Sequence, residues 1–312
     1  MKRWVLLAAL AALGAGLGFG QQKTAPPPAE QSEEPARISV DVTRVNMLFT
    51  VTDKRGRFVT DLARDDFEVT EGKRPQAIQE FTAESDLPLR LGILIDTSNS
   101  VRDRFRFEQD AAAEFLRTVM RARLDKALLV RFDTHAELVT DLVDDPVKLE
   151  AGIRDLRPGG GTALYDAIYY ACRDKLALDQ PRTKFRRAIV IVSDGDDNQS
   201  DYTRDQALEM AQKADVVIYA ISTNSSGAAT DGDKVLRYLT SETGGRAFFP
   251  FQVEDMEQSF ENIANELRHQ YNILYRPEPL LTDGQWHPVS LRVKGRKDLI
   301  VRARAGYYAP KL

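Results

Sequence analysis

Continuous apolar segments alternate with helical patterns along the middle of the chain. The apolar segments are too short for helices, and they lie at 91–95, 127–132, 188–193 and 216–222. Such runs are typical of parallel strands that helices cover on both faces. Apolar residues recur at helical spacing between and after them, at 107–122, 146–156, 163–178, 204–214 and 255–270. This alternation predicts a doubly wound α/β domain with a mostly parallel sheet at 88–270.

Both sides of this region have β patterning instead. Residues 38–87 contain short alternating segments around Gly-centred turns, and residues 271–312 contain further segments separated by Asp-Gly and Lys-Gly turns. Each flank alone has too few strands for an independent core. We therefore expect the two flanks to pair as the N-terminal and C-terminal halves of one small β-sandwich, with the α/β domain inserted between them.

The N-terminus differs from the rest of the chain. A basic start precedes an apolar run from Trp4 to Phe19, which is shorter than the roughly 20 residues of a membrane-spanning helix. This pattern is typical of a secretory signal peptide, here 1–20. Residues 21–37 are rich in Pro, Gln and Glu and predict a disordered linker. We expect an exported protein, periplasmic or extracellular, that contacts the envelope membrane only through an uncleaved N-terminal segment.

The amino-acid composition and net charge exclude some classes of binding partner. Of the 312 residues, 43% are hydrophobic and 29% are charged, which is ordinary for a globular protein. The net charge of −4 gives no basic surface for nucleic acid, so we expect no nucleic-acid partner. The single cysteine, Cys172, excludes an intramolecular disulfide, and its place on the apolar face of a predicted helix indicates a buried core residue.

Three polar clusters come where predicted elements begin or end. The sequence DTSNS (96–100) follows the first apolar strand, GGGT (159–162) opens a predicted helix, and Asp194 closes the strand at 188–193. Ligands of open α/β sheets bind at the carboxyl ends of the strands, where these clusters should meet. Hydroxyl and carboxylate oxygens are the ligands that Mg²⁺ prefers. The DTSNS hydroxyls therefore look like half of a metal site, to which Asp194 brings a second carboxylate from the neighbouring strand.

These motifs resemble the metal-ion-dependent adhesion site of the von Willebrand factor type A domain. The family motif D-x-S-x-S is present as DTSNS, the separate threonine as Thr162 in GGGTAL, and the later aspartate as Asp194 in VSDGDDN. The resemblance covers roughly residues 88–270. The flanks, with VTDKRGRFVTDLARDDFEVTEG ahead and ARAGYYAP near the end, resemble a bacterial exported subfamily.

The resemblance implies a binding mechanism. Ser98, Ser100 and, in one state, Thr162 would hold Mg²⁺ directly, with Mn²⁺ or Ca²⁺ as alternative ions. Asp96 and Asp194 would act directly or through water. Mostly neutral ligands leave positive charge on the ion, and an Asp or Glu of a partner protein completes its coordination. This is adhesion-type protein binding, so the resemblance implies no enzyme activity.

Other interpretations explain less of the pattern. Helix capping accounts for one hydroxyl residue but not for five residues in three segments. The DGDDN segment lacks the Gly and Glu positions of an EF-hand, and GGGT lacks the Lys of a phosphate-binding loop. Two alternative functions stay open. One is a structural subunit of a cell-envelope assembly with a stapling metal, and the other is a metal-assisted hydrolase, for which no general base stands near Asp96.

Overall fold

The computed structural model describes residues 44–311 except 84–86, 103, 181–183, 225, 251 and 253–254. The predicted signal peptide (1–20) and linker (21–37) lie outside the described residues. Among the described helices, none has the length and apolar composition that crossing a membrane requires.

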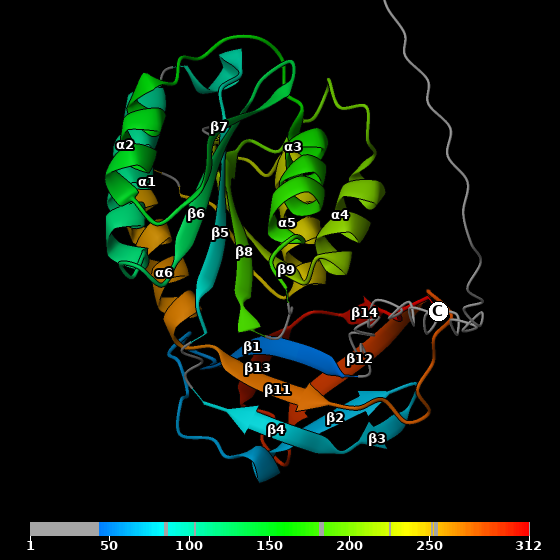
Figure 1. Cartoon of the computed structure of the whole chain (residues 1–312). Helices are drawn as coiled ribbons and strands as arrows, with labels where there is room; N and C mark the ends of the chain where they lie inside the picture. The colour runs from blue at the N-terminus through cyan, green and yellow to red at the C-terminus, as the bar shows by residue number, and fades with distance from the viewer. Residues whose placement is uncertain are drawn as a thin grey trace, which may run out of the picture. The chain divides into compact units, whose positions relative to one another are not determined.

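A six-stranded sheet forms the centre of the α/β region, in the order β10-β9-β8-β5-β6-β7 (Figure 1). Five strands run parallel: β5 (Leu89–Asp96), β6 (Lys126–Phe132), β8 (Arg186–Ser193), β9 (Val216–Ser222) and β10 (Ala247–Phe248). The edge strand β7 (Ala136–Val143) is antiparallel and was not predicted. Every residue of β5, β8 and β9 is buried, as their continuous apolar sequences predicted.

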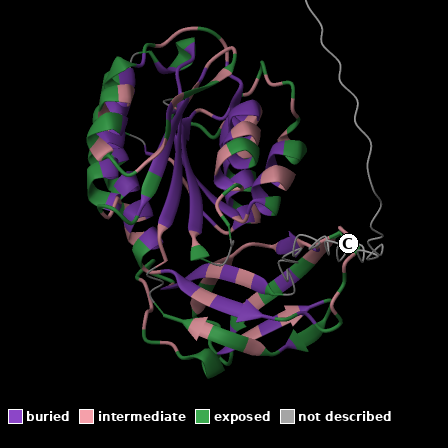
Figure 2. Ribbon diagram, viewed as in Figure 1, coloured by how far each residue is buried: buried purple, intermediate pink, exposed green. Residues whose placement is uncertain are grey.

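Helices cover both faces of this sheet (Figure 2). One face packs against α1 (Phe105–Val119), α2 (Pro146–Asp155) and α6 (Asp255–Arg268). The other packs against α3 (Leu164–Ala171), which continues as a π-helical segment (Cys172–Leu176), α4 (Arg204–Lys213) and α5 (Asp231–Thr243). Helix α5 was not among the predicted helices. The predicted α/β fold with a mostly parallel sheet is confirmed.

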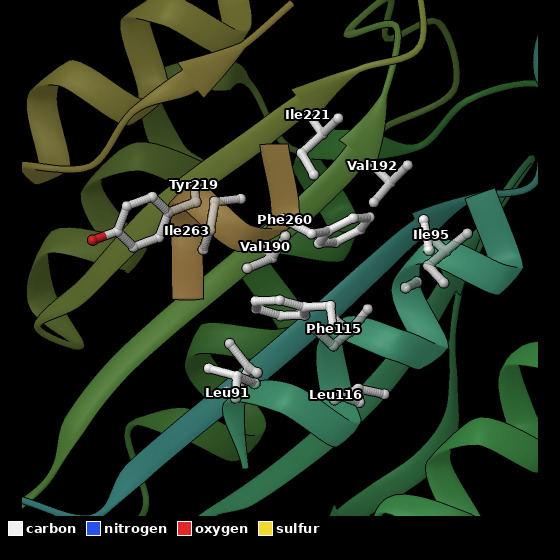
Figure 3. Close-up of a cluster of buried hydrophobic side chains, with 14 of the residues drawn as sticks. Leu91, Ile95, Phe115, Leu116, Val190, Val192, Tyr219, Ile221, Phe260 and Ile263 are labelled. Atoms are coloured by element: carbon white, nitrogen blue, oxygen red, sulfur yellow. The ribbon is translucent and has the colours of Figure 1, made fainter. Parts of the chain in front are cut away.

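The first and last helices of the α/β region meet over the middle of the sheet. Phe115 of α1 packs against Phe260 of α6, with ring centroids 5.0 Å apart. Figure 3 shows both rings beside Val190 and Val192 of β8. On the opposite face Cys172 is fully buried and free, as predicted, and burial raises the pKa of its thiol above the ordinary value.

The two flanks pair with each other and form two antiparallel sheets. The first has the order β13-β1-β11-β4, with β1 (Val45–Asp53), β4 (Ile78–Thr82), β11 (Tyr271–Tyr275) and β13 (Leu299–Ala303). The second has the order β14-β12-β2-β3, with β2 (Phe67–Glu71), β3 (Arg74–Gln76), β12 (Trp286–Val293) and β14 (Gly306–Tyr308). Each sheet takes strands from both flanks, and the two share one hydrophobic cluster. The domain limits themselves remain predictions.

Glu71 ties the N-terminal flank to the last strands. It is buried at the end of β2, and its carboxylate accepts hydrogen bonds from the hydroxyls of Tyr275 (2.9 Å) and Tyr307 (3.0 Å). Burial, reinforced by this carboxylate, raises the pKa of both tyrosines above the ordinary value. Gly306 lets the last strand approach β12, because a Cβ there would lie 2.3 Å from the carbonyl oxygen of His287.

We predict that Tyr307→Phe lowers the free energy of unfolding by about 1.5–3 kcal/mol, because it removes a hydrogen bond to a buried carboxylate. The matched control is Tyr308→Phe on the same strand, whose hydroxyl has no hydrogen bond within the described part of the chain and should cost little. Urea unfolding followed by circular dichroism measures both. Equal stabilities of the two variants would show that Glu71 does not hold the flanks together.

Candidate metal site

The DTSNS loop begins where β5 ends, and it fixes Asp96 firmly. Asp96 is fully buried, and its Oδ1 accepts a hydrogen bond from the Ser98 amide (2.8 Å). Its Oδ2 accepts a second one from the Ser193 hydroxyl (2.6 Å). Burial raises the pKa of Asp96 to about 6, and the nearby Asp194 carboxylate adds to the increase while the two serines oppose it. The carboxylate is thus held rigidly at the carboxyl end of the central strand.

Alternate residues of this loop point in different directions. The Ser98 and Ser100 hydroxyl oxygens lie 2.9 Å apart, with Ser98 buried and Ser100 exposed. Thr97 faces the other way, because its amide (2.9 Å) and hydroxyl (3.3 Å) both donate to the carbonyl oxygen of Phe132 on β6. The spacing D-x-S-x-S therefore places its two serine hydroxyls together, as predicted.

The glycine loop approaches the DTSNS loop backbone to backbone. The Gly159 amide donates to the carbonyl oxygen of Thr97 (2.6 Å), and the Asn99 amide donates to the carbonyl oxygen of Gly160 (3.3 Å). Gly160 has a φ of 87°, and a Cβ there would lie 2.7 Å from Oγ1 of Thr134. This close approach leaves Thr162, the next predicted ligand, buried at the start of α3.

The third loop, which carries Asp194, binds the glycine loop in turn. The carbonyl oxygen of Thr162 accepts hydrogen bonds from the amides of Asn198 (2.9 Å) and Gln199 (3.1 Å). The Thr162 amide donates to Oδ1 of Asn198 (3.1 Å). Asp194 follows β8 directly and is half-buried. All five predicted residues thus lie in three mutually hydrogen-bonded loops at one end of the sheet.

Helix capping does not explain these hydroxyls. Ser98 precedes a short 3₁₀ turn (Asn99–Val101) but makes no side-chain cap there. The capping position of α1 is Arg104, and that of α3 is Ala163 rather than Thr162. The hydroxyl groups are therefore available for another role.

The donor set consists of hard oxygen atoms and fits a cation such as Mg²⁺. It offers two carboxylates and three hydroxyls, and among the described residues His, Cys, Asp and Glu do not gather into a metal-holding group of three or more. Within the described chain, Asp96 and Asp194 form no ion pair with a basic side chain. Their negative charge is left without a compensating cation from the protein.

Two residues of the site were missed by sequence reasoning. Ser193 links the loops, since its hydroxyl donates to Asp96 and accepts from the Gly195 amide (3.0 Å). The sequence feature that could have revealed Ser193 is its position next to Asp194 at the end of a predicted strand. Glu108 in α1 is fully buried, and burial raises its pKa to about 8, with the Asp96 charge adding to the effect. It resembled a surface residue of an amphipathic helix.

Comparison with known proteins finds a family match within the α/β region. Residues 91–196 match the family model of the von Willebrand factor type A domain. This range is about a third of the chain and contains all five predicted site residues, in agreement with the resemblance seen in the sequence. The adhesion-site chemistry, the exported subfamily and a bacterial origin stay predictions.

Solved structures share the fold of this domain. The von Willebrand factor type A protein from Catenulispora acidiphila superposes with a TM-score of 0.52 at 14% identity, covering 78% of this chain and 73% of that one. Proximal thread matrix protein 1 from the mussel byssus gives 0.51 at 14% identity, covering 72% and 50%. The same byssus protein with a zinc-occupied MIDAS motif gives 0.51 at 15%, covering 62% and 48%. The curated proteins contain no match to this chain.

We predict that Gly160→Ala lowers the free energy of unfolding by more than about 1 kcal/mol, because its positive φ and the nearby Thr134 hydroxyl both disfavour a Cβ. Gly159→Ala is the matched control, since no atom lies within 4 Å of the Cβ it would add. Chemical unfolding compares the two variants with the unchanged chain. Similar stabilities of both variants would mean that the glycine loop does not need its observed conformation.

Proposed function

We propose that this protein is an exported, metal-dependent protein-binding module of the adhesion type. Its von Willebrand factor type A domain would hold Mg²⁺, or alternatively Mn²⁺ or Ca²⁺, at Asp96, Ser98, Ser100, Thr162 and Asp194. An Asp or Glu of a partner protein would complete the coordination. The proposal includes no catalysis and no nucleic-acid partner.

One observation carries this proposal: the two serine hydroxyls converge, 2.9 Å apart, next to a carboxylate that two hydrogen bonds already hold. Neutral hydroxyls bind a hard cation without cancelling its charge. Zinc in the MIDAS motif of a byssus protein with this fold supports a divalent ion at such a site.

Each residue would then have a separate part in binding. Bound Mg²⁺ supplies a positive charge with room for a ligand from outside. Asp96, fixed by hydrogen bonds from Ser98 and Ser193, would supply negative charge that holds the ion. Ser98 and Ser100 would supply neutral oxygens, and Ser100 is exposed to solvent. Thr162 lies on a separate loop, so it can change its contact with the ion while Asp96 stays fixed.

A metal that only staples the fold is the weaker alternative. The three loops already hold one another through backbone hydrogen bonds, such as those between Gly159 and Thr97 and between Asn198 and Thr162. A cation is therefore not needed to join them. Binding an acidic partner gives the metal a role that the protein's own hydrogen bonds do not already fill.

Export rests on the basic start and apolar run of the first twenty residues. We expect a mature chain that begins near Gln21 in an exported fraction of the native host. N-terminal sequencing of that protein decides the question. A chain with an intact Met1 in the cytoplasmic fraction would refute export while leaving the metal site untouched.

We predict that Asp96→Asn abolishes Mn²⁺ binding, because it removes the fixed charge beneath the ion, while Thr162→Ala leaves part of it. At a Mn²⁺ concentration 100-fold above Kd the unchanged chain should gain about 2.7 kcal/mol in stability. The control is Asp201→Asn, an exposed charge in the third loop, which should bind as the unchanged chain does. Calorimetric titration measures the affinities.

Partner capture tests the second half of the mechanism. The unchanged chain and Asp201→Asn should retain an envelope protein from extract in Mg²⁺ and release it in EDTA. Asp96→Asn should retain none at any Mg²⁺ concentration, and Thr162→Ala should retain less. Capture by metal-free Asp96→Asn equal to that of the unchanged chain would contradict adhesion through the metal.

A further inference from the structure

Glu108 is a buried carboxylate without a hydrogen-bond partner. It lies in the first turn of α1, which begins five residues after Ser100, and its side chain is fully buried. Neither Oε1 nor Oε2 accepts a hydrogen bond from any residue that the structure describes. Leaving an ionised carboxylate buried and unpaired is costly, and such a group calls for an explanation.

The position of Glu108 in a helix does not explain why its carboxylate is buried without a partner. A glutamate in a first turn usually stabilises the helix through its dipole or by bonding to a free amide. Here the capping residue is Arg104, and neither oxygen of Glu108 reaches an amide within the described residues. A role in helix formation would leave the burial of the carboxylate unexplained.

The charges that surround Glu108 are those of the candidate metal site. Asp96, Arg104 and Asp194 are the groups whose charges act on it, and two of the three are negative. Among the described residues Glu108 forms no ion pair, and Nη1 of Arg104 is itself buried without a partner. With all three carboxyl groups ionised and Arg104 charged, this group of side chains carries two uncompensated negative charges. A divalent cation would balance them.

We propose that Glu108 is an outer carboxylate of the metal site, which holds the cation through bound water and makes the site selective for a divalent ion. This inference rests on the proposed metal-binding function. Glu108 acts through water, because the acidic residues that the structure describes form no group of three that could hold a metal directly. Buried oxygens without a protein partner are suited to accept hydrogen bonds from metal-bound water.

The test measures Mn²⁺ affinity in the full chain by electron paramagnetic resonance of the free ion. Glu108→Gln keeps the shape of the side chain and removes its charge, and we expect Kd to weaken about 10- to 100-fold. The control is Glu114→Gln on the same helix, whose side chain is 63% exposed and should leave Kd unchanged. Mg²⁺ competition should show the same order of affinities.

Thermal unfolding gives a second measurement, the melting temperature, which is compared in EDTA and in Mn²⁺. In EDTA, Glu108→Gln should melt no lower than the unchanged chain, since burial raises the pKa of Glu108 to about 8, which leaves it uncharged at neutral pH, and glutamine keeps its shape. Its gain in melting temperature on adding Mn²⁺ should be smaller. A large loss of stability in EDTA, with Kd unchanged, would make Glu108 a structural residue and overturn the proposal.

Glu108→Asp keeps the test decisive if the glutamine variant does not fold. It retains the charge but draws it back by one methylene, and a weaker Kd supports the proposal while an unchanged Kd overturns it. The two proposals fail differently. An unchanged chain that binds no Mn²⁺ refutes the metal-binding function and Glu108's role together. Tight binding that both Glu108 variants retain refutes only the role of Glu108.

Discussion

The parallel pairing of β5 with β8 is the constraint on which the site depends. Their register joins Ile95 to Val192, so Asp96 and Ser193 come next to each other where both strands end. The strands are buried along their whole length, and helices cover both faces. Apart from Arg90, Arg186 and Arg187 near their amino ends, these strands carry polar side chains only at their carboxyl ends.

The sequence pattern predicted those parts of the structure that depend on residues close together in the chain. Continuous apolar runs predicted β5, β8 and β9, because a strand covered on both faces has no polar alternation. Within DTSNS, the Ser98 and Ser100 hydroxyls lie together while Thr97 donates to Phe132. Glycines without a Cβ let two loops approach closely, as the backbone contacts of Gly159 and Gly160 do here.

Long-range contacts could not be predicted in the same way. The shortage of strands in each flank indicated that the flanks pair, but not that β11 lies between β1 and β4. Edge strand β7 has a half-exposed, mixed sequence and gave no clear signal. Ser193 resembles the end of an apolar strand, and Glu108 resembles a surface residue of α1. Their roles arise from neighbours that are distant in the sequence.

Negative charge is the main physical property of the candidate site. Its three loops are already joined by backbone hydrogen bonds, while Asp96, Asp194 and Glu108 bring negative charge to one end of the sheet. Helix α1 begins at this site, carries Glu108 and packs through Phe115 against Phe260 of α6. Helix α6 ends at Arg268, three residues before β11 enters the paired flanks. Two packed helices thus lie between the candidate metal site and the β-sheets.

The most direct test of this account is anomalous diffraction from crystals of the full chain grown with Mn²⁺. The account predicts one anomalous peak among the oxygens of Ser98, Ser100 and Thr162, with water between the ion and Glu108. A peak at another place in the fold, or no peak in crystals grown in saturating Mn²⁺, would contradict it.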